Sequence, residues 1–201
     1  MKKIKTVCVY CGSGPGVNPA YVEAADALGA AFAANGVRLV YGGGSLGLMG
    51  TIARSVLRNG GQVTGIIPEF LVAREKMLRD VDELIITKDM HERKKLMFER
   101  ADGFVALPGG AGTLEETVEM LTWSQLGQHE KPIVLANIAG FWDPLVVLFT
   151  HMRKEEFIRE GLLVRYVVAD SVAEILPKME KSLADCRPAD QSDVAPSLSN
   201  L

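Results

Sequence analysis

Hydrophobic residues along the chain fall into two alternating patterns. Short apolar runs rich in β-branched residues, typical of buried strands, are separated by longer segments with the apolar spacing of amphipathic helices. The predicted strands are residues 6–10, 37–41, 61–67, 83–87, 103–107, 132–137 and 166–170. The predicted helices are residues 19–35, 46–59, 90–101, 113–127 and 142–155, and a last one that begins near Ser171 and that Pro177 is expected to break or restart. This alternation indicates an α/β fold, a Rossmann-like doubly wound parallel sheet with helices on both faces.

Length and composition suit one compact unit. The chain has 201 residues, of which 48% are hydrophobic, so we expect a single domain over residues 1–186. Residues 187–201 are rich in Pro, Ser and Asp and are predicted to form a disordered tail. The net charge of −3 and the scattered Lys and Arg residues argue against a nucleic-acid partner. No apolar run approaches a membrane span or a signal peptide, so we expect a cytoplasmic protein without a membrane partner.

The cysteines and histidines do not form a recognisable redox or metal site. Cys8 and Cys11 make a C-x-x-C pattern, but it lies inside a predicted strand rather than at a helix start, so we interpret both as small packing residues with reduced thiols. His91, His129 and His151 are far apart in the sequence and lack the spacing of metal ligands. No metal is therefore expected.

Three glycine-rich turns follow predicted strands. They read CGSGPG at 11–16, YGGGSLG at 41–47 and PGGAGT at 108–113. Glycine allows close backbone approach, and a helix that begins just afterwards offers free N–H groups to an anion. Any one of these loops alone is explained by a tight turn. Three at one edge of the sheet favour a phosphate site, with PGGAGT as its principal loop.

Two common nucleotide motifs fit the sequence poorly. Gly42, Gly44 and Gly47 satisfy the dinucleotide pattern G-x-G-x-x-G, but they follow the second strand rather than the first, and Glu69 lies late for the acid that should contact the ribose. A Walker-type triphosphate site is excluded because the PGGAGT loop lacks its lysine.

Charged residues flank the principal loop. On a helix that begins near Thr113, Glu116 shares a face with Thr113, whereas Glu115 and Glu119 form a neighbouring pair that we expect to be solvated. A preceding helix capped by Asp89 would place Met90, Arg93, Lys94 and Met97 on one side. Arg93 would then compensate the charge of Glu116, although spacing alone leaves open whether the two meet.

MHERK at 90–94 and PGGAGTLEE at 108–116, together with CGSG at 11–14 and YGGGSLGLMG at 41–50, resemble the LOG family of cytokinin riboside 5'-monophosphate phosphoribohydrolases over residues 5–180. The resemblance implies hydrolysis of the N-glycosidic bond of a nucleoside 5'-monophosphate, without a cofactor, by a homodimer. Arg93 and Glu116 correspond to the catalytic pair. The phosphate-binding residues would be Gly109, Gly110, Gly112 and Thr113, with Ser13 and Gly43 in the accessory turns.

The base pocket and the competing function stay open at this stage. Met90 and Lys94 are predicted to contact the base or sugar, and Met97 and Trp123 are further candidates that are equally explained as core residues. A preference for cytokinin nucleotides over AMP does not follow from the sequence. The alternative is a non-catalytic carrier or sensor of a phosphorylated heterocycle, similar to molybdenum-cofactor carriers, although the Arg93 and Glu116 pair favours the enzyme.

Overall fold

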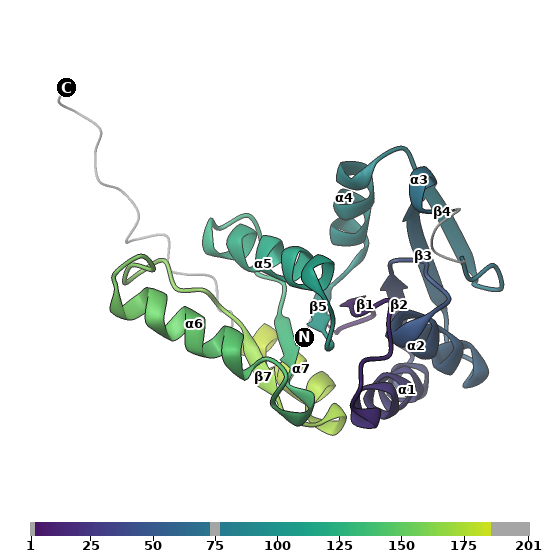
Figure 1. Ribbon diagram of the computed structural model, residues 1–201, viewed down its shortest axis with the longest axis horizontal. Coiled ribbons are helices and arrows are strands. Elements are labelled where there is room, and N and C mark those ends of the chain that lie inside the picture. The colour runs from purple at the N-terminus through teal and green to yellow at the C-terminus, as the bar shows by residue number, and fades with distance from the viewer. Residues whose placement is uncertain (1–2, 73–76, 186–201) are drawn as a thin grey trace.

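A computed structural model describes residues 3–72 and 77–185 and shows a layered α/β fold (Figure 1). The strands are β1 (Thr6–Tyr10), β2 (Arg38–Tyr41), β3 (Val63–Pro68), β4 (Glu83–Thr87), β5 (Gly103–Ala106), β6 (Ile133–Ala136) and β7 (Val167–Ala169). The helices are α1 (Pro19–Ala34), α2 (Gly47–Arg58), α3 (Glu69–Val72), α4 (Met90–Arg100), α5 (Ala111–Gln125), the 3-10 turn η1 (Ile138–Gly140), α6 (Asp143–Lys154) and α7 (Val172–Asp185). The predicted tail at 187–201 lies outside the described residues.

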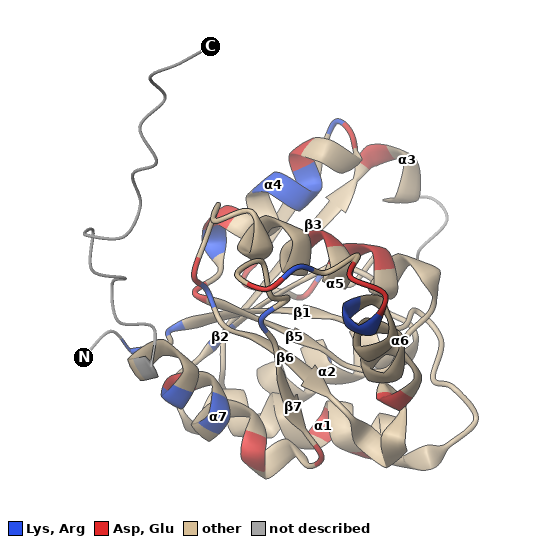
Figure 2. Cartoon of the chain, turned by 90° about the vertical axis from the view of Figure 1, so that its left-hand side faces the viewer, with Lys and Arg blue, Asp and Glu red and all other residues tan. Residues whose placement is uncertain are grey.

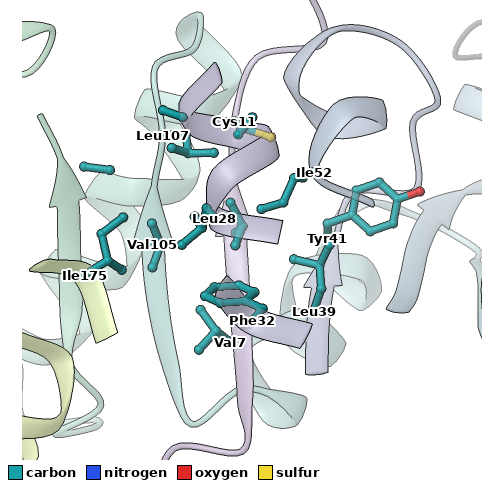
Figure 3. Packing of buried hydrophobic residues seen from close by; sticks show 14 of the residues in the cluster. Val7, Cys11, Leu28, Phe32, Leu39, Tyr41, Ile52, Val105, Leu107 and Ile175 are labelled. Carbon is teal, nitrogen blue, oxygen red and sulfur yellow. The ribbon is translucent and has the colours of Figure 1, made fainter. Parts of the chain in front are cut away.

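All seven strands pair in parallel in the order β4-β3-β2-β1-β5-β6-β7, which confirms the doubly wound sheet. Alternate residues of β1 enter different cores. Val7 and Val9 pack with α1, α2 and α7 on one face, whereas Cys8 and Tyr10 pack with α4, α5 and α6 on the other. Figure 3 shows the first core, where Phe32 and Leu28 of α1 lie over the central strands. Burial on both faces explains why the strands are continuous apolar runs.

The chain winds outward from the centre of the sheet in both directions. Strands β2, β3 and β4 follow on one side of β1, and β5, β6 and β7 follow on the other. The connections after β1 and β5 therefore diverge to opposite faces, and open α/β sheets bind their ligands at such a point, beyond the carboxyl ends of the strands. CGSGPG follows β1 and PGGAGT follows β5, so two of the predicted glycine-rich loops meet at this point.

Three details of the helices differ from the sequence-based expectation. Helix α7 continues through Pro177 without a break. Pro177 is exposed and removes a single N–H donor, while Ile175 and Met179 on either side are fully buried and hold the helix on the sheet. Helix α5 begins at Ala111 rather than 113, with Gly110 as N-cap. The short helix α3 was not predicted, because four residues are too few for a periodic pattern.

Candidate active site

Arg93 and Glu116 form a buried ion pair at the carboxyl edge of the sheet. The Arg93 Nη1 atom donates to the Glu116 Oε1 atom at 2.8 Å, and the two side chains are 9% and 11% exposed. The Nε atom of Arg93 donates to the carbonyl oxygen of Ile66 in β3 at 3.1 Å. The expectation that Arg93 compensates Glu116 is therefore confirmed as a contact, and β3 fixes the plane of the guanidinium.

The start of α4 explains the direction of Arg93. The Asp89 side chain accepts a hydrogen bond from the Glu92 N–H at 2.9 Å, which confirms Asp89 as N-cap, and the Glu92 carboxylate accepts from the Lys88 N–H at 2.8 Å. Reciprocal bonds of this kind satisfy donors that a helix leaves free at its start. They begin the helix at Met90, so that Arg93, one turn later, faces the sheet.

Two glycines make room for the functional side chains. A Cβ atom at Gly42 would overlap the Nη2 atom of Arg93, so only glycine leaves space for the guanidinium beneath the second glycine-rich loop. A Cβ atom at Gly109 would overlap Thr113 Oγ1 and lie 2.9 Å from the backbone nitrogen of Gly12. Gly109 thus allows the first and third glycine-rich loops to touch.

The PGGAGT loop leads into the amino end of α5, where the first N–H groups of a helix have no partner within the helix. The first bond within α5 runs from the Leu114 N–H to the Gly110 carbonyl oxygen at 3.0 Å, so the N–H groups of the preceding turn point out of the helix end. The Gly12 N–H donates to the Pro108 carbonyl oxygen at 3.0 Å and anchors the loop to the turn after β1. These amides and the positive end of the helix dipole suit a phosphate.

The structure places the remaining predicted phosphate residues around the same edge. Gly110 and Gly112 are exposed, Thr113 is buried, Ser13 is exposed in the turn after β1, and Gly43 is buried in the turn after β2. Binding of a phosphate by these residues stays a prediction.

Burial controls the ionisation of Glu116. Loss of solvent raises its pKa above the usual value, and the adjacent Arg93 opposes this rise. Among the nearby charges, Glu115 raises the pKa further and Lys94 lowers it. Arg93 and Lys94 therefore favour the charged form of a carboxyl group whose charge burial disfavours.

Lys94 forms an ion-pair cluster that the sequence analysis missed. Its Nζ atom donates to Glu115 Oε1 at 2.7 Å and to Glu119 Oε1 at 2.9 Å. Both carboxylates share this cation. Glu115 is 54% exposed, as the sequence predicts, whereas Glu119 is only 23% exposed, so the prediction of a solvated side chain is wrong for Glu119. The one signal for this cluster in the sequence was adjacency: Lys94 is next to Arg93 on α4, and Glu115 is next to Glu116 on α5.

The floor of the site is apolar and uncharged. Cys8 and Cys11 are buried free thiols, and burial raises the pKa of both far above the usual value for cysteine. Burial likewise raises the pKa of Tyr10. The interpretation of the two cysteines as packing residues is confirmed.

The candidate base contacts separate into two groups. Met97 is 1% exposed and belongs to the core under α4 and α5, and Trp123 packs edge-on against Phe98 with 5.1 Å between ring centroids. Met90, at the first position of α4 and one helical turn before Arg93, is half-buried. It is the candidate best placed at this edge, and its contact with a base stays a prediction.

A cavity of about 540 Å³ lies elsewhere, at the amino ends of β6 and β7. His129 is among its lining residues, but this ring accepts from the Lys131 N–H at 3.1 Å and bonds the Met120 carbonyl oxygen at 3.0 Å. Arg93 and Glu116 do not line this cavity, so we locate the candidate active site at the carboxyl edge of the sheet. Within the described residues, no cluster of three His, Cys, Asp or Glu side chains is arranged to hold a metal ion.

Comparison with known sequences gives a consistent set of relatives. Residues 49–179 match the family described as "Possible lysine decarboxylase". A probable cytokinin riboside 5'-monophosphate phosphoribohydrolase of Oryza sativa subsp. japonica is 47% identical over 175 residues, which span 87% of this chain and 78% of the relative. A cytokinin riboside 5'-monophosphate phosphoribohydrolase of Arabidopsis thaliana is 43% identical over 178 residues, which span 89% and 84%.

Solved structures share the fold at lower identity. The molybdenum cofactor carrier protein of Chlamydomonas reinhardtii superimposes with a TM-score of 0.67 and 23% identity, over 91% of this chain and 99% of that chain. A molybdenum cofactor binding protein of Rippkaea orientalis superimposes with a TM-score of 0.64 and 22% identity, over 91% and 99%. This likeness shows the fold alone.

Proposed function

The chain belongs to the LOG family of cytokinin riboside 5'-monophosphate phosphoribohydrolases, and from this premise we propose that it hydrolyses the N-glycosidic bond of adenosine 5'-monophosphates, including N6-modified ones. The products are the free base, a cytokinin when the base is so modified, and ribose 5-phosphate. The observation that carries this proposal is the buried Glu116, paired with Arg93 beside the free amides of the PGGAGT loop.

The carboxylate supplies the chemistry. Breaking a ribosyl C–N bond passes through a cation-like sugar, which a nearby carboxylate stabilises, as in glycoside hydrolysis. Unit charges about 4 Å apart at an effective dielectric of about 20 interact by roughly 4 kcal/mol. Expressed only in the transition state, that energy corresponds to about a thousandfold in rate. Glu116 fits this role, and Arg93 keeps it ionised and oriented.

The phosphate loop supplies positioning. If Gly109, Gly110, Gly112 and Thr113 hold the 5'-phosphate, the sugar carbon is kept against Glu116, and binding energy from the unreactive phosphate is used for orientation. Ser13 and Gly43 complete the edge of this site in the proposal. Met90 and the third N–H of Lys94 are the proposed contacts to the base or sugar. No cofactor enters the scheme.

Hydrolysis suits these residues better than the decarboxylation that the family description mentions. Amino-acid decarboxylases that use an electron-sink cofactor hold it on an uncharged lysine amine. Lys94, the lysine beside Glu116, donates to two carboxylates, and these hydrogen bonds, although burial opposes them, raise its pKa above the usual value. It therefore stays an ammonium ion, which is unable to form a Schiff base.

The Glu116→Gln variant tests the proposal. Purified protein is incubated with AMP and with N6-isopentenyladenosine 5'-monophosphate, and free base is measured by chromatography. We expect the variant to bind AMP as well as the wild type but to release base about a thousandfold more slowly. Glu99→Gln on the exposed face of α4 is the matched control and should keep full activity.

Two outcomes would contradict the assignment. Equal turnover by the Glu116→Gln variant would remove Glu116 from the mechanism. Tight nucleotide binding by the wild type with no base released over hours would favour the carrier function. A carrier is the alternative because the molybdenum cofactor carriers share this fold.

We also propose that the protein acts as a homodimer in the cytoplasm, as one domain over residues 1–186, without a nucleic-acid partner. Val147 and Leu148 on α6 and Phe157 beyond it are 66%, 45% and 86% exposed and suit a contact between copies. Acidic and basic residues are mixed over the face in Figure 2. No helix among the described residues has the length and apolarity needed to cross a membrane. A single-chain mass in sedimentation at micromolar concentration would contradict the dimer.

A further inference from the structure

Two adjacent ion-pair groups join α4 to α5. Arg93 and Glu116 lie on the inner side, and Lys94 with Glu115 and Glu119 lies next to them toward solvent. Two neighbouring residues of α4, Arg93 and Lys94, therefore form ion pairs with two neighbouring residues of α5, Glu116 and Glu115. The Lys94 side chain is only 14% exposed, so its ammonium is held within the helix interface rather than on the free surface.

Glu119 depends on this lysine. Its Oε1 atom bonds Lys94, and its Oε2 atom is buried without a hydrogen-bond partner among the described residues. Glu115 lies one turn earlier on the same helix face, where a second carboxylate repels it. Without Lys94, two neighbouring acids, one of them largely buried, would lose their cation and separate.

We propose that Lys94 is a positioning residue for hydrolysis: by holding Glu115 and Glu119, it fixes the first turns of α5 against α4 and keeps Glu116 aligned with Arg93. This role rests on the proposed function. It is additional to any contact of the third Lys94 N–H with the substrate, and the two are separable by experiment.

The effect falls on the chemical step more than on substrate binding. The PGGAGT loop is anchored through the Gly12–Pro108 hydrogen bond and through the close approach of Gly109 to Gly12, both upstream of Glu115. Loss of Lys94 leaves these anchors in place and frees the turns that carry Glu116. A carboxylate displaced by about 1 Å from the reacting carbon costs about a hundredfold in rate.

Lys94 also balances the charges around Glu116. Arg93 and Lys94 face it from α4, Glu115 lies beside it on α5, and Cys8 and Tyr10 of β1 and Cys11 directly after β1 are close enough to interact electrostatically with it. These three groups stay neutral because burial raises the pKa of each. Removal of Lys94 therefore raises the pKa of Glu116, and removal of Glu115 lowers it.

The test is a double-mutant cycle read in kcat, KM and the pH profile. We expect Lys94→Met to lower kcat about tenfold to a hundredfold, with KM changed less than about twofold. The acid limb of kcat should move to higher pH in this variant and to lower pH in Glu115→Gln. Lys94→Arg should restore much of the rate. Lys95→Met, at a lysine 72% exposed on the same helix, should leave kcat unchanged.

The cycle separates positioning from direct contact. In a Glu115→Gln, Glu119→Gln background, Lys94→Met should change kcat less than about threefold, because its partners are already absent. The same loss in both backgrounds, or a raised KM with unchanged kcat, would overturn the proposal in favour of a substrate contact. If the wild type released no base, the proposed function would fail. The positioning role would then be decided by NMR titration of Glu116, and an unchanged pKa in Lys94→Met would overturn it.

Discussion

At the residue scale, the Arg93–Glu116 pair shows why a buried charge needs its partner. The two side chains are only 9% and 11% exposed, so water stabilises neither charge. An intact pair of this kind adds little net stability, whereas removal of one partner leaves an uncompensated charge and costs about 3–5 kcal/mol. The pair is therefore better explained by the proposed chemistry than by a contribution to stability.

This predicts a pH-dependent loss of stability in Arg93→Met. Burial raises the pKa of Glu116 and Arg93 opposes the rise, so the variant should raise this pKa further. An acid whose pKa is higher in the folded state than in the unfolded state holds its proton more tightly when the protein is folded. The free energy of unfolding therefore falls as the pH rises above the pKa of the unfolded state. Urea unfolding should show a loss of about 3–5 kcal/mol at pH 8 and a smaller loss at pH 5.

Two further variants check the cause. Arg93→Met combined with Glu116→Gln should recover most of the lost stability at pH 8, because no buried charge remains. Arg100→Met removes an arginine that is 40% exposed in its pair with Glu83 and should change stability only slightly. An equal loss at both pH values in Arg93→Met would point to lost packing instead of the charge of Glu116.

At the element scale, α1 and α2 pack closely because Gly29 has no side chain. A Cβ atom there would lie 2.6 Å from Ser55 Cβ and 2.8 Å from the Ile52 carbonyl oxygen. The Ser55 hydroxyl donates to the Asp26 carbonyl oxygen at 2.6 Å across the same contact. Helix α2 begins at Gly47, directly after the second glycine-rich loop, so this packing also supports the loop around Arg93.

Gly29→Ala should therefore destabilise the protein although alanine favours helices. Overpacking costs about 1–3 kcal/mol, against a gain in helix propensity of about 1 kcal/mol, so we expect a net loss in thermal or urea unfolding. Ala27→Leu, at an exposed position of α1, is the control and should be close to neutral. A more stable Gly29→Ala protein would mean that the two helices separate at little cost.

The elements themselves could be predicted where local signals agree with the fold. Each predicted strand overlaps the observed one, and all but β3, which runs one residue further to Pro68, lie within the predicted range, because burial on both faces leaves a continuous apolar run. Asp89 marked the start of α4 correctly. The sequence could not reveal that α7 passes through Pro177, since buried neighbours on the sheet decide this. It named Arg93 and Glu116 but not their contact, nor the bonds of Lys94, because these depend on how α4 and α5 pack.

At the scale of the whole molecule, the site joins the two halves of the sheet. The turn after β1 leads to the face covered by α1, and the turn after β5 leads to α5 on the opposite face, yet Gly12 and Pro108 in these turns share a hydrogen bond. A ligand bound here contacts loops from both halves. Its binding energy should therefore stabilise the entire fold rather than one segment.

This predicts which ligands raise the unfolding temperature. A ligand at a hundred times its dissociation constant adds about 2.7 kcal/mol to the free energy of unfolding. We expect ribose 5-phosphate to stabilise the wild type, and AMP to stabilise the Glu116→Gln variant, in which it is not consumed. Ribose and adenosine at the same concentrations should have little effect, because they lack the anion that the amides around Gly110 and Gly112 would bind. Differential scanning fluorimetry makes the comparison, and equal stabilisation by adenosine would show that the base, not the phosphate, holds the nucleotide at this edge.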